Sequence, residues 1–373
     1  MSTGWRIPLV DLARTTDPIA SQMEAVFRRV RASGSYVLGP EVEAFERACA
    51  ETLSIEHAIG VSSGTDALVA ALLALDVGVG DEVIVPTFTF IASAEAVLRV
   101  GARPVLVDSA DGAFHADPDA IASATGTRTK VIIPVHLFGD CVEPAPVLAQ
   151  ARAAGIAVVE DAAQAFGVRC AGGTPGTWGA VGCFSFFPTK TLGAMGDGGL
   201  VVTRDASLAD RVRSIRQHGA ESKDAFHRVG GNYRLDALQA GLLRLRLAGL
   251  PEEIAQRRRG AALYRQALEH LGDRIVFPRR ADGATYNPFV VRIPSCRDRV
   301  ARELAAAGIQ TAVYYRHPLH TQKVFATLGL RAGGFPNAER AAGEALALPL
   351  FPGIRDEEIA LVVDAVKRSL LCG

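Results

Sequence analysis

The segment KVIIPVHLFGDCVEPAPVLAQARAAGIAVVED, residues 130–161, decides the fold class. Its apolar start predicts a strand, the run EPAPVLAQARAAG predicts a helix, and IAVVED predicts a second strand. The alternation begins near residue 58, with further strands expected at HAIGV, DEVIVP, ARPVLVD, AVGCFSFF and GGLVVT, and helices at TDALVAALLALDV and FIASAEAVLRVG. It predicts an α/β domain with a mainly parallel sheet that is covered on both faces. Ligands are expected at the carboxyl ends of the strands.

The chain has 373 residues, which is enough for two domains. Residues 234–250 predict a long helix, and Pro251 then interrupts it and begins a second helix. We therefore predict a large domain over residues 1–250, with a helical N-terminal region, and a small α+β domain over residues 251–373. In the small domain we expect strands at NPFVVRI and IQTAVYY, a helix at DRVARELAAAG and two helices around LALPLF.

Composition argues against several classes of protein. Lys+Arg 40 and Asp+Glu 40 give a net charge of zero, so we expect no nucleic-acid partner. The six cysteines contain no CxxC pair and no His pair accompanies them, so we expect neither a metal site nor a disulfide framework. The N-terminus has no apolar signal-peptide core and no stretch of 18 apolar residues occurs, so we expect a cytoplasmic protein without membrane contact.

The run SSGTDAL, from Ser62 to Leu68, lies between a predicted strand and a predicted helix. Gly64 lets the backbone approach an anion, Thr65 can donate a hydroxyl, and the helix N–H groups point outward. We count Ser63, Gly64 and Thr65 as candidate phosphate ligands. An ordinary Ser/Thr cap with a glycine turn is the alternative.

Asp161 follows the apolar run AVV directly, at the end of a predicted strand. A buried acid there needs a cationic partner, and a pyridinium nitrogen is a good one, because the Asp keeps the ring protonated as an electron sink. Gln164, one helical turn on, is placed to bond a phenolic oxygen of the same ring. The alternative for Asp161 is a cap of the following helix.

Lys190 stands in the turn of FSFFPTKTLGAMGDGGLV, residues 184–201, and is one of only five lysines in the chain. A lysine in a tight turn beside a buried cofactor has a pKa lowered by desolvation, which makes its amine nucleophilic and able to form a Schiff base. Ser185 can contact a phosphate. A solvated surface lysine is the alternative. Together, the phosphate loop, strand-end Asp and turn Lys are typical of a pyridoxal phosphate (PLP) enzyme.

These segments resemble the DegT/DnrJ/EryC1/StrS group of sugar aminotransferases, which have the fold-type-I aminotransferase fold. The resemblance covers nearly the whole chain and includes YVLGPEVEAFE, VSSGTDAL, DEVIVPTFTFIAS, PVHLFG, VVEDAAQ, FSFFPTKTLGAMGDGG, NYRLDALQA and FPNAERAAGEALALPLFPG. It implies that Lys190 forms the internal aldimine, that Asp161 binds the pyridine nitrogen and that Gln164 lies beside the ring oxygen. It further implies that Phe90 stacks on the ring.

The resemblance also implies a partner subunit and a reaction. Gly64, Thr65 and Ser185 match phosphate-binding positions, and Asn232 matches an Asn that reaches the phosphate of the neighbouring subunit's cofactor, which implies a homodimer with shared sites. The implied reaction is transamination: L-glutamate leaves its amine on the cofactor as pyridoxamine phosphate, and a ketone on a nucleotide-linked sugar accepts it. Lys190 moves the proton in both halves.

The substrate side is where the chain departs from its relatives. Family members that combine EDAAQ with an H-L-aromatic-G segment look like those acting on 3-ketosugars linked to dTDP, so the resemblance at Gln164 and at the segment that begins at His136 implies a 3-ketosugar rather than a 4-ketosugar. Phe187 replaces a tyrosine of many relatives, Tyr314-Tyr315-Arg316 replaces their VHYPxPLH pattern while His320 is kept, and Lys223 is kept in an altered neighbourhood. We expect Arg316 or Arg228 to contact a diphosphate or a carboxylate, with a solvated arginine as the alternative.

Two other functions remain open at this point. A cyclitol (inosose) aminotransferase has the same chemistry and differs only in its acceptor. A regulatory or binding protein on the same fold is less favoured, because the lysine, the Asp and the phosphate loop are intact and no helix-turn-helix extension or basic arm is visible.

Overall fold

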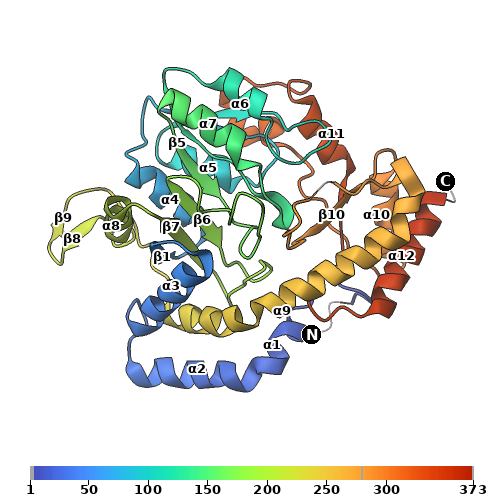
Figure 1. The fold of residues 1–373 in the computed structure, drawn as a ribbon, viewed down its shortest axis with the longest axis horizontal. Coiled ribbons are helices and arrows are strands. Elements are labelled where there is room, and N and C mark those ends of the chain that lie inside the picture. The colour runs from blue at the N-terminus through green and yellow to red at the C-terminus, as the bar shows by residue number, and fades with distance from the viewer. Residues whose placement is uncertain (1–3, 279, 372–373) are drawn as a thin grey trace.

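The computed structural model describes residues 4–278 and 280–371. A seven-stranded sheet in the order β1-β7-β6-β5-β4-β2-β3 lies at its centre, between layers of helices (Figure 1). The strands are β1 (His57–Val61), β2 (Glu82–Pro86), β3 (Arg103–Val107), β4 (Thr129–Ile132), β5 (Ala157–Asp161), β6 (Val181–Ser185) and β7 (Gly199–Thr203). Of these seven strands only β7 runs in the opposite direction to the other six. The predicted mainly parallel sheet is confirmed, with every predicted strand of the large domain in place.

Helices cover both faces of this sheet because alternate strand residues point to opposite sides. Val83 and Val85 of β2 join one hydrophobic cluster, whereas Ile84 between them joins another on the opposite face. The covering helices are α3 (Pro40–Leu53), α4 (Gly64–Ala74), α5 (Ala92–Arg99), α6 (Pro118–Ala124), α7 (Pro144–Ala154) and α8 (Ala206–Ile215). Helix α4 is buried on nearly all sides, as its almost wholly apolar sequence predicts.

The predicted break at Pro251 is wrong. One helix, α9 (Ala237–Leu268), runs straight through the proline. Its first half packs on α3 and α2 (Ala20–Ser33), and its second half packs on α12 (Asp356–Leu371). Leu250 and Ile254 are buried on either side of Pro251 in one hydrophobic cluster. Tertiary packing on both sides therefore outweighs the hydrogen bond that the proline removes.

The C-terminal part builds a second hydrophobic cluster from Ile7 and residues between 261 and 370. Its elements are β10 (Phe289–Arg292), α10 (Arg297–Ala306), α11 (Pro336–Glu344), β11 (Ala345–Leu348) and α12. The expected strand at IQTAVYY is wrong: this segment forms only isolated bridges, from Ile309 to Ile7 and from Ala312 to Ala347. The division into domains at residue 250 stays a prediction, and the position falls inside α9.

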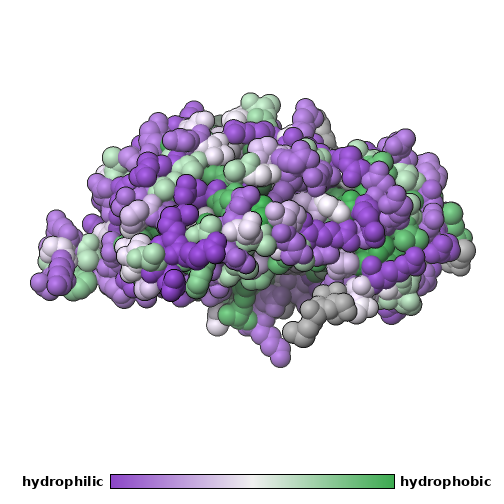
Figure 2. Space-filling view, turned by 90° about the horizontal axis from the view of Figure 1, so that it is seen from below, coloured by the Kyte–Doolittle hydropathy of each residue, from purple (hydrophilic) through white to green (hydrophobic). Residues whose placement is uncertain are grey.

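A small hairpin of β8 (Ala220–Ser222) and β9 (Ala225–Phe226) projects from the body beyond α8, at the left of Figure 1. The remaining short elements are α1 (Ala13–Thr16) and the 3-10 turns at Asp17–Ile19, Leu137–Gly139, Glu269–Arg274, Leu319–Thr321 and Lys323–Leu328. The face in Figure 2 is mostly hydrophilic, with small hydrophobic patches between polar residues. Within the described ranges, no helix combines the length and apolarity needed to span a membrane.

Candidate active site

The carboxyl ends of β1, β2, β5 and β6 surround one cavity of about 490 Å³. In a parallel sheet this edge is where ligands bind, because the loops that follow the strands converge there. Eight of the nine residues predicted to bind the cofactor line the cavity: Ser63, Gly64, Thr65, Phe90, Asp161, Gln164, Ser185 and Lys190. Asn232 lies outside it. The topology thus brings together residues up to 127 positions apart, Ser63 and Lys190.

One end of the cavity is built by the start of α4. The Ser63 hydroxyl accepts a hydrogen bond from the backbone N–H of Asp66 at 3.1 Å, so it caps the helix. The first N–H groups of the helix have no partner within it and favour an anion. A Cβ on Gly64 would lie 2.7 Å from the Cβ of Ser185, so only glycine allows this close approach. The helix cap and a phosphate site, the two alternatives for this run, are therefore compatible.

Asp161 ends β5 and is held in one orientation. It is only 5 % exposed. One carboxylate oxygen accepts a hydrogen bond from the Ser93 hydroxyl at 2.6 Å, and the other accepts one from the backbone N–H of Ala163 at 3.1 Å. Ser93 was missed at the level of sequence. Its one feature in the sequence is that it is the single hydroxyl residue of the segment FIASAEAVLRVG, and only the structure shows that this position is buried beside Asp161.

Gln164 connects two walls of the cavity. Its side-chain oxygen accepts a hydrogen bond from the backbone N–H of Phe138 at 2.6 Å, and its amide nitrogen donates to the Tyr315 hydroxyl at 3.1 Å. The ring of Tyr315 stacks on Phe138 with a centroid distance of 6.2 Å. Burial raises the pKa of Tyr315, so its hydroxyl stays protonated and remains a hydrogen-bond donor at neutral pH.

Lys190 occupies the turn after β6, and its backbone N–H donates to the carbonyl of Phe187 at 2.8 Å. Burial lowers the pKa of the Lys190 amine to about 8, and the negative charge of Asp161 partly opposes this shift. A sizeable neutral fraction therefore exists near pH 8, and the neutral amine is the nucleophilic form.

Two aromatic rings stand at the cavity with large exposed areas. Phe90 is 56 % exposed and Phe187 is 50 % exposed, although both line the cavity. The Phe90 ring lies 6.2 Å from that of Tyr315 at an angle of 37°. An exposed face on Phe90 is available to stack on a flat ligand ring.

The two histidines predicted to lie beside the substrate form hydrogen bonds with other groups of the protein. The His136 ring lies 3.0 Å from Glu160 and accepts a hydrogen bond from the backbone N–H of Val142 at 3.1 Å. The His320 ring bonds Thr87 at 2.8 Å and Glu339 at 3.1 Å. His136 lines the cavity and His320 does not. With both nitrogens of each ring engaged, neither side chain offers a free group to a substrate.

The predicted basic residues lie away from the cavity of their own chain. Arg316 is exposed and bonds Asp298 at 3.2 Å. Lys223 and Arg228 are exposed on and beside the β8–β9 hairpin, and Asn232 pairs with Gln217 on the same side of the molecule. Of the predicted substrate residues only His136, Phe187, Tyr314 and Tyr315 line the cavity.

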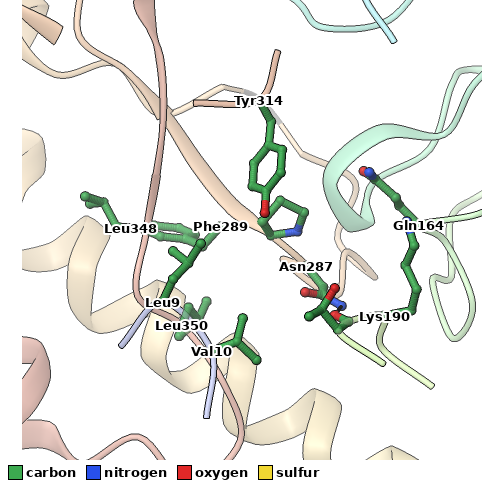
Figure 3. Close-up of a pocket in the computed structure, with 11 residues that line it drawn as sticks. Leu9, Val10, Gln164, Lys190, Asn287, Phe289, Tyr314, Leu348 and Leu350 are labelled. Carbon is green, nitrogen blue, oxygen red and sulfur yellow. Dashed lines mark hydrogen bonds between the residues drawn. The ribbon is translucent and has the colours of Figure 1, made fainter. Parts of the chain in front are cut away.

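A smaller cavity of about 80 Å³ adjoins the first one and shares Lys190, Gln164, Thr189 and Tyr314 with it (Figure 3). Leu9 and Val10 from the N-terminal segment and Phe289 from β10 form part of its apolar wall. Asn287 lies beside Lys190 in this view. The lysine therefore stands between the sheet edge and the C-terminal part of the chain.

Comparison with known proteins agrees with this geometry. The model of the DegT/DnrJ/EryC1/StrS aminotransferase family matches residues 18–367. UDP-N-acetyl-3-dehydro-α-D-glucosamine 3-aminotransferase of Acidithiobacillus ferrooxidans is 42 % identical over 99 % of this chain and 100 % of its own length. The dTDP-3-amino-3,4,6-trideoxy-α-D-glucose transaminase of Streptomyces venezuelae is 40 % identical over 97 % of this chain and 96 % of its own.

The crystal structure of S. venezuelae DesV in complex with a ketimine intermediate superposes with a TM-score of 0.94 at 39 % identity, covering 98 % of this chain and 99 % of DesV. The fold-type-I architecture predicted from the sequence is thereby confirmed. The chain belongs to the DegT/DnrJ/EryC1/StrS aminotransferase family.

Proposed function

We propose that this protein transfers the amino group of L-glutamate to the C3 ketone of a nucleotide-linked deoxysugar, with dTDP as the favoured nucleotide. The family makes the protein a PLP-dependent sugar aminotransferase. The donor, the nucleotide and the position of the ketone are the proposed parts. Two relatives at 40–42 % identity are named for 3-amino products or 3-aminotransfer, and this supports C3.

The observation that carries the PLP chemistry on which this proposal rests is the pair of Asp161 and Lys190 on one cavity. The space of about 490 Å³ is large enough for PLP, and the cradle between Gly64 and Ser185 fits a phosphate. Asp161, oriented by Ser93, fits the ring nitrogen, and Phe90 fits the ring face. When bound, PLP supplies an electron sink for the carbanion that forms at the reacting carbon.

The chain's own residues then have separate tasks. The α4 N-terminus, with Ser63, Gly64, Thr65 and Ser185, holds the phosphate. Lys190 anchors the cofactor, and when free it removes and returns the proton at the reacting carbon, for which a pKa of about 8 is well matched. Gln164 is held by Phe138 and Tyr315 in a position to bond the ring oxygen.

We further propose a homodimer in which the hairpin region of one subunit completes the site of the other. Among the residues that the structure describes, Lys190 is the one cation that lines the cavity, whereas both proposed substrates are anions. Lys223, Arg228 and Asn232 are exposed on one side of the molecule and do not serve their own cavity. The hairpin region also exposes Phe226 at 62 % and Val229 at 81 %, an arrangement that favours burial against a second copy.

A panel assay tests the proposed substrates. The purified protein is supplied with PLP, L-glutamate and either dTDP-linked 3-keto-6-deoxyhexoses, their 4-keto isomers, or UDP-linked 3-ketosugars. Mass spectrometry then follows the change from ketone to amine. We expect turnover of the dTDP-linked 3-ketosugar to exceed that of the other two classes. Preferred turnover of a UDP-linked sugar or of a 4-ketosugar would contradict the proposed acceptor without affecting the family assignment.

A further inference from the structure

The turn that carries Lys190 is tied to the C-terminal part of the chain by a single buried amide. The Asn287 side-chain nitrogen donates to the backbone carbonyl of Thr189 at 3.0 Å and to the Thr191 hydroxyl at 3.2 Å. These are the residues immediately before and after Lys190. The Thr189 carbonyl belongs to the peptide unit that bears the Lys190 N–H, so the bond fixes the plane from which the lysine side chain leaves.

The segment that carries Asn287 also holds the opposite wall of the cavity. The backbone N–H of Thr285 donates to the carbonyl of Gly139 at 2.7 Å, and the neighbouring Phe138 N–H donates to Gln164. A Cβ on Gly139 would lie 2.4 Å from the Thr285 hydroxyl, so the segments that carry these two residues are in tight contact. One short segment therefore braces both the lysine turn and the loop that orients Gln164.

We propose that Asn287 is a positioning residue that fixes the backbone on both sides of Lys190 and thereby directs its amine into the cofactor cavity. Asn287 is buried and lies beside Lys190 on the smaller cavity (Figure 3). The inference rests on the proposed role of Lys190 as cofactor anchor and is independent of the sugar.

An uncharged side-chain amide meets this demand. One nitrogen must donate twice, to a carbonyl and to a hydroxyl oxygen, and neither an alanine nor a carboxylate can do so. Thr191 is itself buried, so loss of the amide leaves a polar oxygen without its partner. We expect the turn to loosen and admit water, which reduces the desolvation of the Lys190 amine.

The same turn offers a matched control. Gln239 of α9 accepts a hydrogen bond from the Met195 N–H at 2.9 Å and donates to the Met195 carbonyl at 3.1 Å. This too is an amide with two bonds to the turn, but the residue that it bonds, Met195, lies five residues beyond Lys190 and is exposed. If Asn287 only stabilised the turn in general, Gln239→Ala would have the same effect as Asn287→Ala.

The test measures how the cofactor-free protein takes up PLP as a function of pH, followed by the absorption band of the lysine-bound cofactor. Only the neutral amine reacts, so the wild-type rate should rise with a midpoint near pH 8. For Asn287→Ala we expect the midpoint to move up by about one unit and the rate at pH 7 to fall about tenfold. Gln239→Ala should keep the wild-type midpoint.

A second variant covers the case in which Asn287→Ala does not fold. Thr191→Val removes only one of the two acceptors and keeps the side-chain shape, so we expect a smaller shift in the same direction. An unchanged midpoint in Thr191→Val and in any folded Asn287→Ala protein would overturn the proposal, as would an equal shift in Gln239→Ala. Formation of the band in Lys190→Ala would instead refute the role of Lys190.

Discussion

The cofactor cavity and the β8–β9 hairpin region hold their polar groups in opposite ways. In the cavity Asp161 is fixed by Ser93, Gln164 by Phe138 and Tyr315, and the lysine turn by Asn287. On the hairpin side Lys223 and Arg228 are exposed, and neither has a salt-bridge partner among the described residues of its chain. The cavity groups proposed to act on the cofactor are thus held in place by their own chain. The cations proposed to bind the substrate, Lys223 and Arg228, are held by no such contacts in the described part of their chain and are proposed to act in the site of a second subunit.

The largest effect is expected from a change in the cofactor cavity itself, at Lys190. Lys190→Ala should lower transamination by about 10⁴-fold, because it removes both the anchor and the group that moves the proton. The visible band of the lysine-bound cofactor should be lost as well. Lys130→Ala is the control, since this lysine bonds Asp81 at 3.0 Å away from the cavity. Turnover of Lys190→Ala near the level of the control would contradict the proposed mechanism.

Asp161→Asn keeps the shape of the side chain and removes its charge. Turnover should fall about 10²–10³-fold, as expected when a preorganised electrostatic partner of the reacting system is lost. A second readout follows from the sign of the interaction: the Asp161 charge raises the pKa of Lys190 against the lowering by burial. The midpoint of PLP uptake in Asp161→Asn should therefore lie below pH 8. A midpoint that stays the same or rises would show that the carboxylate is not electrostatically coupled to the lysine.

On the hairpin side we expect a smaller effect, and one confined to substrate binding. Arg228→Ala should raise the KM for the nucleotide sugar about tenfold, because a charged hydrogen bond to a phosphate or carboxylate contributes about 1.5 kcal/mol. The lysine-bound cofactor band should not change. Arg204→Ala removes the same charge from an exposed pair with Glu56 and serves as the control. Equal KM values for the two variants would argue against the proposed sharing of sites.

The same contrast separates what the sequence predicted from what it did not. Strand ends can be read from short apolar runs, so the sequence alone predicts that Ser63, Asp161 and Lys190 share one edge of the sheet. Ser93 and Asn287 could not be found that way, because their roles depend on contacts with Asp161 and Thr189, which lie 68 and 98 residues away in the chain. Local propensity also failed at Pro251, where packing of α9 on both sides keeps the helix continuous.

His320 gives the smallest expected effect on activity and tests the boundary between the two regions. The sequence predicts that His320 lies near the sugar, because this histidine is kept from the pattern of its relatives. In the structure, both of its ring nitrogens form hydrogen bonds, one with Thr87 and one with Glu339. His320→Leu should therefore lower the free energy of unfolding by about 1–3 kcal/mol, because it leaves buried polar groups unpaired. The KM for the sugar should stay within about twofold of wild type, since no group that can reach the cavity is lost. Chemical denaturation and steady-state kinetics on one preparation separate the two outcomes. A tenfold rise in KM with unchanged stability would contradict this prediction. It would show that His320 contacts the sugar and that the 3-10 turn at Leu319–Thr321 belongs to the substrate site.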